Sequence, residues 1–197
     1  MIAENLLLAY DAQKLNLRKK QVLFKIGTLP RYYYQVVSGT VKKNNFNEDG
    51  KEFIQGIFSK GNSFGEPPLF GDLPYPASAE ALEDSVVWQL KKSDFLKLLK
   101  EHPDIHLSVT KTLSKRLHYK ATMVAEISTE RAEHRLLKLM DYLKTNEGTP
   151  ADQKYQVLLS RQQMADLTGL RVETVIRAIK NLEKEKNVVL KEHKIYR

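Results

Sequence analysis

The densest group of side chains that could do chemistry lies in one stretch, Ser160–Glu185, which reads SRQQMADLTGLRVETVIRAIKNLEKE. Apolar residues recur in its second half at helical spacing, which predicts a helix with one buried face. The other faces of that helix would carry groups that donate and accept hydrogen bonds: Arg171, Glu173, Thr174, Arg177 and Lys180. Such a set suits recognition through hydrogen bonds and offers no nucleophile paired with a base.

Two helices joined by a sharp turn would position these side chains. Ser160 can cap a first helix, and Gln163 three residues later can complete a capping box. Gly169 supplies the turn, after which Leu170 and Val175 face the first helix. This order is typical of a helix-turn-helix whose second helix enters the DNA major groove. The alternative is a plain helical hairpin in which Gly169 only ends the first helix and the charges are solvated.

The bulk composition favours an anionic partner and excludes thiol chemistry. The 197 residues fit one large domain or two small ones. A net charge of +8 and a pI of about 9.4 favour a partner such as nucleic acid. The chain has no cysteine, so it cannot form disulfides, thiolate metal sites or cysteine-held iron–sulfur clusters.

The first residues predict neither export nor membrane insertion. The segment MIAENLLLAYDAQKLN has an acid at position 4 and lacks the basic start of a signal peptide. No apolar run approaches the roughly 18 residues that a membrane span needs. We therefore expect a cytoplasmic protein. Residues 4–16 suggest a short amphipathic helix, with Leu6, Leu7, Tyr10 and Leu15 as its apolar set.

Short β-strands are predicted between Gln21 and Leu90, where runs rich in Val, Ile, Phe and Tyr alternate with glycine turns. Asn47–Gly50 is a good hairpin turn, because Asp-Gly tolerates positive φ. Strands at this spacing indicate an antiparallel sandwich, barrel or jelly roll. The expected strand segments are QVLFKI, YYYQVV, TVKKNNF, KEFIQGIF, AEALE and SVVWQL.

A long helix is predicted from Ile105 to about Ile127, preceded by Pro103 at a position that favours helix initiation. Small and aliphatic residues at 3–4 spacing suit a two-helix dimer interface. The alternative is a core helix folded against its own barrel, and both can hold on different faces. The expected interface residues are Leu107, Leu113, Leu117, Ala121 and Val124, with Thr110, Ser114 and Ile127 beside them.

The last seventy residues predict a separate domain. Ser128-Thr129-Glu130 interrupts the long stripe, so we place a hinge there, with Thr129 capping the next helix. Tyr155–Leu158 reads as a short strand, and NVVLKEHKIYR as a two-strand wing that turns at Glu192-His193. Nine Lys or Arg and five Asp or Glu follow from Ser160 to the end, so this region is basic.

The whole order of elements resembles the cyclic-AMP receptor protein/FNR family of bacterial transcription regulators. The motifs that carry the resemblance are Gly61 with Phe64-Gly65-Glu66, His102-Pro103-Asp104-Ile105, Ser160-Arg161-Gln162 and Glu173-Thr174-Val175-x-Arg177. Each is weak alone, but their order and spacing are specific. The resemblance implies an α+β fold with a cyclic-nucleotide-binding-type β-barrel (a jelly roll) at 1–103, a dimerisation helix at 104–127 and a winged helix-turn-helix at 128–197.

The resemblance also implies how DNA would be bound. A homodimer would present two recognition helices to a palindromic site on double-stranded DNA, with RNA polymerase as a further partner. Glu173 would accept from a cytosine amine, and Arg177 would donate to guanine O6 and N7. Ser160 and Arg161, with Gln162 beside them, would hold phosphates. Arg often precedes the Glu in this family, whereas here that position is Val172, so Arg171 is expected at a phosphate. Thr174 and Lys180 complete the expected DNA-binding set.

The family's cyclic-nucleotide pocket is only partly present. Its glycine–glutamate pair matches Gly65 and Glu66, but Ala77 or Pro76 stands where the phosphate-clamping arginine belongs. Ser78 follows at the serine position. The hydroxyl pair that contacts adenine from the dimer helix aligns with Lys120 and Ala121.

The residues around this pocket argue against an anionic ligand. From Glu66 to Leu90 there are five acids and no Lys or Arg. Pro67 and Pro68 remove two backbone N–H donors where a short helix would offer them. A buried phosphate without a charge partner is costly. We therefore predict a degenerate or repurposed pocket with no identified effector. The alternative is a cyclic-AMP-type regulator whose clamp is atypical and uses Lys120.

Other classes of function have less support in the sequence. His102 and His106 are four residues apart, but His102 precedes Pro103 and lies at a helix cap, so we expect no metal site. There is no nucleophile elbow, phosphate loop or zinc spacing, and we expect no enzyme activity. A sensor or dimerisation module that docks a protein through its helical end would need an apolar outward face, where Arg171, Arg177 and Lys180 are polar.

Overall fold

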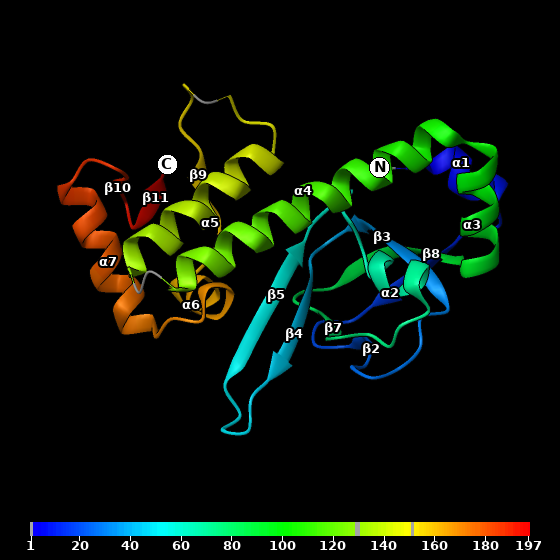
Figure 1. Cartoon of the computed structure of the whole chain (residues 1–197), viewed down its shortest axis with the longest axis horizontal. Coiled ribbons are helices and arrows are strands. Elements are labelled where there is room, and N and C mark those ends of the chain that lie inside the picture. Colours follow the sequence, from blue (N-terminus) through cyan, green and yellow to red (C-terminus); the bar gives the residue numbers. More distant parts are fainter. Residues whose placement is uncertain (1, 129–130, 151) are drawn as a thin grey trace. The chain divides into compact units, whose positions relative to one another are not determined.

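The computed structural model of the chain describes residues 2–128, 131–150 and 152–197 (Figure 1). Contacts between residues divide the chain into two compact units, Met1–Ser114 and Lys115–Arg197, each described by itself below. The first unit contains α1 (Glu4–Ala9), β1 (Gln13–Leu17), β2 (Val22–Phe24), β3 (Tyr32–Ser38), β4 (Val41–Phe46), β5 (Glu52–Phe58), β6 (Ser63–Phe64), α2 (Glu66–Gly71), β7 (Ser78–Ala81), β8 (Ser85–Lys91) and α3 (Lys92–Glu101).

The helix α4 (Pro103–Ser128) runs from the first unit into the second. The second unit also contains α5 (Ala132–Asn146), β9 (Gln156–Val157), α6 (Arg161–Thr168), α7 (Val172–Lys184), β10 (Val189–Lys191) and β11 (Lys194–Tyr196). No helix of the described residues is long and apolar enough to cross a membrane.

The first unit is a sandwich of two four-stranded antiparallel sheets, ordered β1-β8-β3-β6 and β2-β7-β4-β5. The inner core takes residues from both sheets, including Phe24, Val41, Phe64 and Val87. All six predicted strand segments are strands, and the predicted turn at Asn47–Gly50 joins β4 to β5 with Gly50 at φ +74°. The jelly-roll prediction is confirmed, and β6 is an additional short strand.

A second core covers the outer face of the β1-β8-β3-β6 sheet. Successive residues of a strand point to opposite faces, so Tyr33 packs outward with Trp88 while Tyr34 packs into the sandwich. Helices close this outer core: Phe95 from α3 stacks on Tyr33 with ring centroids 4.4 Å apart. The run of three tyrosines is therefore explained by strand alternation, as the β-rich pattern predicts.

The prediction of one helix over residues 4–16 is wrong. The helix α1 ends at Ala9, Asp11 takes a left-handed conformation at φ +62°, and β1 begins at Gln13. β1 pairs with β8 from Gln13↔Gln89 to Leu17↔Ser85. Leu15 and Leu17 both pack on the sandwich core, which fits the two-residue period of a strand.

The long helix α4 has one face against protein and one face exposed. Its buried side includes Val109 in the outer core of the first unit and Met123 in the core of the second. Of the predicted dimer residues, Leu113 lies partly buried on the first unit's own core. The other four predicted dimer residues are exposed: Leu107, Leu117, Ala121 and Val124. The three residues expected beside them are exposed as well, namely Thr110, Ser114 and Ile127.

The second unit packs three helices and a small sheet around one core. Leu136 and Met140 of α5 meet Met164 of α6 and Ile179 of α7. The predicted wing is present, with β10 and β11 joined by Glu192 and His193. β9 adds a third strand, so the sheet order is β10-β11-β9. The predicted cap at Thr129 lies outside the described residues; α5 begins at Ala132 after Arg131.

Candidate nucleic-acid interface

The first helix of the motif, α6, begins with the predicted reciprocal cap. The Ser160 hydroxyl accepts the Gln163 N–H at 3.1 Å, and the Gln163 side chain accepts the Ser160 N–H at 2.8 Å. The helix ends at Gly169, whose φ of +71° fits a residue without a side chain. The helix-turn-helix prediction is therefore confirmed in its local geometry. These contacts fix where α6 begins and where α7 can follow.

The second helix, α7, separates its faces sharply. Val175, Ala178, Ile179 and Leu182 are buried in the unit's core. The opposite face is exposed and carries three of the predicted DNA-binding residues: Glu173, Arg177 and Lys180. Arg171 is the N-cap residue and is also exposed, while Thr174 is partly buried. The Arg177 guanidinium, the Glu173 carboxylate and the Lys180 ammonium therefore lie outside the core, where they can contact base edges or phosphates.

The predicted phosphate residues at the start of α6 have partners within the protein. Arg161 Nη2 donates to the His193 carbonyl oxygen at 3.4 Å, which joins the start of α6 to the wing turn. Gln162 Nε2 donates to Asp166 Oδ1 at 2.8 Å along the same helix. Glu192 and His193 both have left-handed backbones, at φ +50° and +63°, as a two-residue hairpin turn requires. Ser160, Arg161 and the wing turn thus belong to one end of the unit.

One exposed residue of α7 escaped the sequence-based prediction. Ile176 is 43% exposed, although its helix has a well-formed apolar face elsewhere. The sequence gave no signal for this exposure, because Val172, Val175, Ile176 and Ile179 all fit the i, i+3, i+4, i+7 spacing of an apolar helix face. Ile176 thus places an exposed apolar side chain beside Arg177, among the polar side chains of this face.

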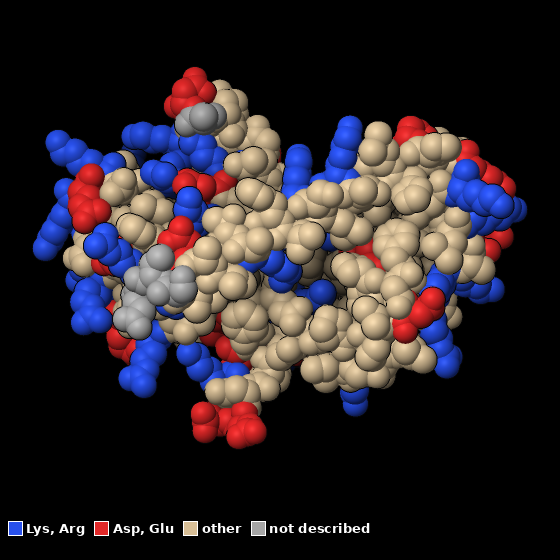
Figure 2. Space-filling view, viewed as in Figure 1, with Lys and Arg blue, Asp and Glu red and all other residues tan. Residues whose placement is uncertain are grey.

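Positive charge gathers on this unit. Figure 2 shows Lys and Arg side chains crowding the part formed by α6, α7 and β10, with acidic side chains between them. Residues Ser160 to Arg197 carry nine Lys or Arg against five Asp or Glu. An excess of basic side chains around an exposed helix provides the electrostatic attraction that nucleic acid binding needs.

The predicted ligand residues of the first unit are largely buried. Gly65 precedes α2 at φ +84°, and Glu66 begins α2 with only 1% of its surface exposed. The buried Ser63 hydroxyl donates to Glu66 Oε1. Ala77 is fully buried, and the Ser78 hydroxyl accepts the Ile26 N–H at 3.0 Å. The serine predicted to face a ligand thus bonds to the protein's own backbone.

Aromatic rings cover the glycine that would lie against a nucleotide. Tyr75 stacks on Phe24 with ring centroids 3.7 Å apart and planes 9° apart. A side-chain Cβ at Gly65 would lie 3.3 Å from Tyr75 Cε1 and 3.6 Å from the Phe24 ring. Tyr75 is 3% exposed, and within the described chain its hydroxyl has no hydrogen-bond partner. Burial raises the Tyr75 pKa, with smaller contributions from Tyr34 and Glu66.

The remaining ligand candidate, Lys120, lies on the part of α4 that belongs to the second unit. Its side chain is exposed. Gly65, Glu66, Ala77 and Ser78 belong to the first unit. Among the residues that the structure describes, no three His, Asp or Glu side chains form a group that could hold a metal ion.

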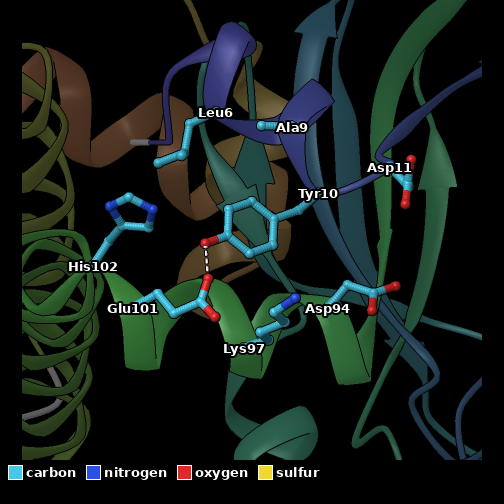
Figure 3. A pocket seen from close by; sticks show the side chains of 8 residues that line it. All are labelled: Leu6, Ala9, Tyr10, Asp11, Asp94, Lys97, Glu101 and His102. Carbon is cyan, nitrogen blue, oxygen red and sulfur yellow. Dashed lines mark hydrogen bonds between the residues drawn. The ribbon is translucent and has the colours of Figure 1, made fainter.

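A separate groove of about 400 Å³ lies between α1 and α3 (Figure 3). Its polar lining mixes acids such as Asp94 with Lys97 and His102. The Tyr10 hydroxyl donates to Glu101 across the groove, and the Tyr10 ring meets His102 edge-on at 5.9 Å. This hydrogen bond raises the Tyr10 pKa. The groove contains none of the predicted ligand residues.

Comparisons with known proteins define the class of protein. Residues 14–102 match the family model described as a cyclic nucleotide-binding domain, and residues 130–196 match the Crp-like helix-turn-helix domain. The two matches follow each other in the order of the two folds seen here. This combination defines a regulator with a sensor-type β domain and a DNA-binding domain.

Relatives and solved structures agree with that class. The fumarate and nitrate reduction regulatory protein of Vibrio cholerae is 26% identical over 181 residues, which cover 91% of this chain and 72% of that protein. The Thermus thermophilus catabolite activator protein superposes with a TM-score of 0.58 at 27% identity, over 97% of this chain and 87% of that one. A CooA mutant from Carboxydothermus hydrogenoformans has the same fold, with a TM-score of 0.80 at 20% identity over 100% and 86% of the two chains.

The chain belongs to the cyclic-AMP receptor protein/FNR family of transcription regulators. Its helix-turn-helix is the DNA-binding element of that family.

Proposed function

We propose that this regulator binds a palindromic DNA site as a homodimer, and that its β domain does not respond to cyclic nucleotides. The observation that carries the DNA-binding part is the exposed face of α7, where Glu173, Arg177 and Lys180 stand clear of a buried apolar face. Glu173 and Arg177 read bases in this proposal. Ser160, Arg161, Gln162, Arg171 and Thr174 contact phosphates or sugar nearby.

The homodimer is supported by the exposed apolar residues of α4. Leu117 is 70% exposed and Val124 67% exposed, at the spacing of a helix–helix seam. Exposed leucine and valine in a row are costly in water, and a second copy of the same helix buries them symmetrically. Two recognition helices related by a two-fold axis match two half-sites of a palindrome.

The loss of cyclic-nucleotide response is supported by the interior of the first unit. A cyclic nucleotide brings a phosphate that needs a charged partner, and Ala77 offers none. Ser78 bonds to Ile26, and the Tyr75–Phe24 stack covers Gly65. The residues present do not fit the nucleotide. Any effector of this protein acts through a different site or chemistry.

We also propose how the chain is divided and where the protein acts. The sensor domain spans 1–103, the dimerisation helix 104–127 and the DNA-binding domain 128–197. The protein acts in the cytoplasm, with RNA polymerase as a partner of the DNA-bound dimer. It has no enzyme activity, in keeping with relatives that are transcription regulators.

Site selection followed by gel shift tests the DNA-binding part. The homodimer selects a palindrome from random DNA, and Glu173→Ala and Arg177→Ala then lose affinity for it by roughly tenfold or more per half-site, because each paired contact to a base contributes about 1–3 kcal/mol. Lys138→Ala, on α5, is the control. If the parent and both variants bind every DNA equally well, the assignment of the base-reading residues to α7 is wrong.

Calorimetry tests the sensor part. Cyclic AMP and cyclic GMP are titrated into the full chain, and no heat of binding is expected at micromolar concentrations. Micromolar binding of either compound supports instead the alternative of a cyclic-nucleotide regulator with an atypical phosphate clamp. The Lys120→Ala variant then shows whether that residue supplies the clamp.

A further inference from the structure

The recognition helix exposes one large apolar side chain among polar ones. Ile176 is 43% exposed, whereas Val175 and Ile179 on either side of it in sequence are 0% and 2% exposed. The described residues that flank it on the outer surface of α7 are Glu173, Arg177 and Lys180, all exposed. Ile176 is therefore not among the residues of the unit's core, and its exposed part is available for a contact from outside the protein.

Helix geometry places Ile176 beside the reading residues. Successive residues of an α-helix turn by about 100°, so Ile176 lies about 60° around the axis from Glu173 and about 40° from Lys180. It is also about one turn away from both along the axis. A base pair that meets Glu173 or Lys180 thus brings its neighbours close to the Ile176 side chain.

The DNA major groove has one apolar feature, the C5-methyl group of thymine. Every other base edge in that groove presents hydrogen-bond donors or acceptors, which a branched hydrocarbon cannot satisfy. Ile176 therefore favours thymine at the position it faces and disfavours the polar edges of other bases.

We propose that Ile176 determines specificity by packing against the methyl group of one thymine in each half-site. This inference rests on the proposed function, because it needs α7 to lie in the major groove. DNA is the occupant of this surface, since the exposed residues that flank Ile176 are basic or form hydrogen bonds. A protein surface that takes Ile176 in its place is an outcome that the experiment below separates.

The test removes only the methyl group. The parent homodimer first selects its palindrome from random DNA. Each thymine of that palindrome is then replaced symmetrically by deoxyuridine, which keeps every hydrogen-bonding group and lacks the C5-methyl. One replacement is expected to weaken binding of the parent by roughly fourfold per half-site, or about fifteenfold for the dimer, the effect of one lost buried methyl-sized group.

Variants connect this loss to Ile176. Ile176→Ala binds the thymine site more weakly and no longer distinguishes thymine from deoxyuridine at that position. Ile176→Val keeps a branched apolar side chain and keeps the distinction. The matched control is Val189→Ala, because Val189 is also 43% exposed but lies on β10 of the wing. Its sensitivity to deoxyuridine equals that of the parent.

The outcomes separate the inference from the proposed function. If the parent selects no site and binds no DNA, the proposed function fails. If the parent binds its site but no thymine replacement matters, or if Ile176→Ala retains the parent's sensitivity, the inference is overturned while DNA binding stands. Circular dichroism of each variant confirms that α7 is folded. If Ile176→Ala is unfolded, Ile176→Gln replaces it, because glutamine is a good helix former without an apolar branch.

Discussion

Ser160 has two expected roles, one within the protein and one toward DNA. Its hydroxyl accepts the Gln163 N–H at 3.1 Å at the start of α6. Ser160→Ala removes that acceptor, and we expect the free energy of unfolding to fall by about 1 kcal/mol. Denaturant unfolding of the dimer measures the change, and Ser160→Thr is expected to retain most of the parent's stability.

The second role of Ser160 can be separated from the first. An aspartate also caps a helix well, so Ser160→Asp keeps the stability of the parent. Its negative charge would lie beside a DNA phosphate, so the variant binds DNA more weakly and the loss shrinks with added salt. Unchanged affinity in low salt would place the start of α6 away from the DNA backbone.

The buried Tyr75 hydroxyl has no hydrogen-bond partner in the described chain, so its removal is expected to change the stability of the protein. An unpaired buried hydroxyl costs roughly 1–3 kcal/mol. Tyr75→Phe keeps the ring that stacks on Phe24 and removes only that oxygen. We expect the free energy of unfolding to rise by about 1 kcal/mol, measured by urea denaturation. A clear loss of stability would show that the hydroxyl has a partner in solution.

Local patterns predicted the cap and the turn of the helix-turn-helix well. The Ser160–Gln163 cap and the left-handed Gly169 depend only on neighbours within one helical turn, so the sequence contains what is needed to infer them. Ile176 and Tyr75 were not predicted. Their roles depend on which atoms of distant segments approach them, and no spacing within the sequence reports that.

Among the elements, the contact of α5 with α7 has a pH dependence that can be measured. Asn181 Nδ2 donates to Glu133 Oε1 at 2.9 Å. This hydrogen bond is the main cause of a Glu133 pKa below its ordinary 4.5. A lowered carboxyl pKa adds stability above the ordinary value, and that stability is lost as the pH falls through the lowered pKa.

Asn181→Ala is therefore expected to raise the Glu133 pKa toward 4.5 and to flatten the acid side of the stability curve. An NMR titration of the Glu133 carboxyl carbon measures the first effect. Asn187→Ala is a suitable control, since Asn187 donates to Glu185 and not to α5. If the Glu133 pKa stays low in Asn181→Ala, its main cause is instead the hydrogen bond between Glu133 and the backbone.

The elements that sequence patterns missed depend on distant partners. β1 was read as part of a helix because Leu6, Leu7, Tyr10 and Leu15 share helical spacing; it is a strand because β8, more than sixty positions later, pairs with it. β6 has two residues and exists only through pairing with β3. The wing and α7, whose partners lie nearby in sequence, were predicted with their correct turns.

For the whole molecule, the decisive prediction concerns assembly. Leu117→Glu puts a charge on the exposed apolar face of α4, and sedimentation is expected to show monomers, because the charge would be buried in the dimer. Since Leu117 is 70% exposed in the single chain, the fold of each unit stays intact. DNA affinity falls with the loss of the second recognition helix.

The control for this variant is Leu96→Glu. Leu96 is also an exposed leucine, 40% exposed, but it lies on α3. We expect it to sediment as the parent does. A dimer that survives Leu117→Glu would contradict the α4 interface.

The sequence could not assign α4 to one face or one unit. Leu113 and Leu117 are four residues apart and share the same period, yet Leu113 packs on its own core while Leu117 is exposed. Periodicity identifies a helix with an apolar face. It does not show whether that face packs on the chain's own core or on a second copy of the helix, because both give the same spacing.

The division of α4 between two units has a consequence for how such regulators can be recombined. Tyr119 and Met123, near the end of α4, pack with α5 and the helix-turn-helix, and Tyr119 stacks on Tyr142 at 3.8 Å. A DNA-binding module transplanted from this protein thus needs to begin near Lys115 to bring its complete core. Such a chimera also receives Leu117, Ala121 and Val124. In the proposed homodimer, the chimera therefore inherits the choice of dimerisation partner together with the choice of DNA sequence.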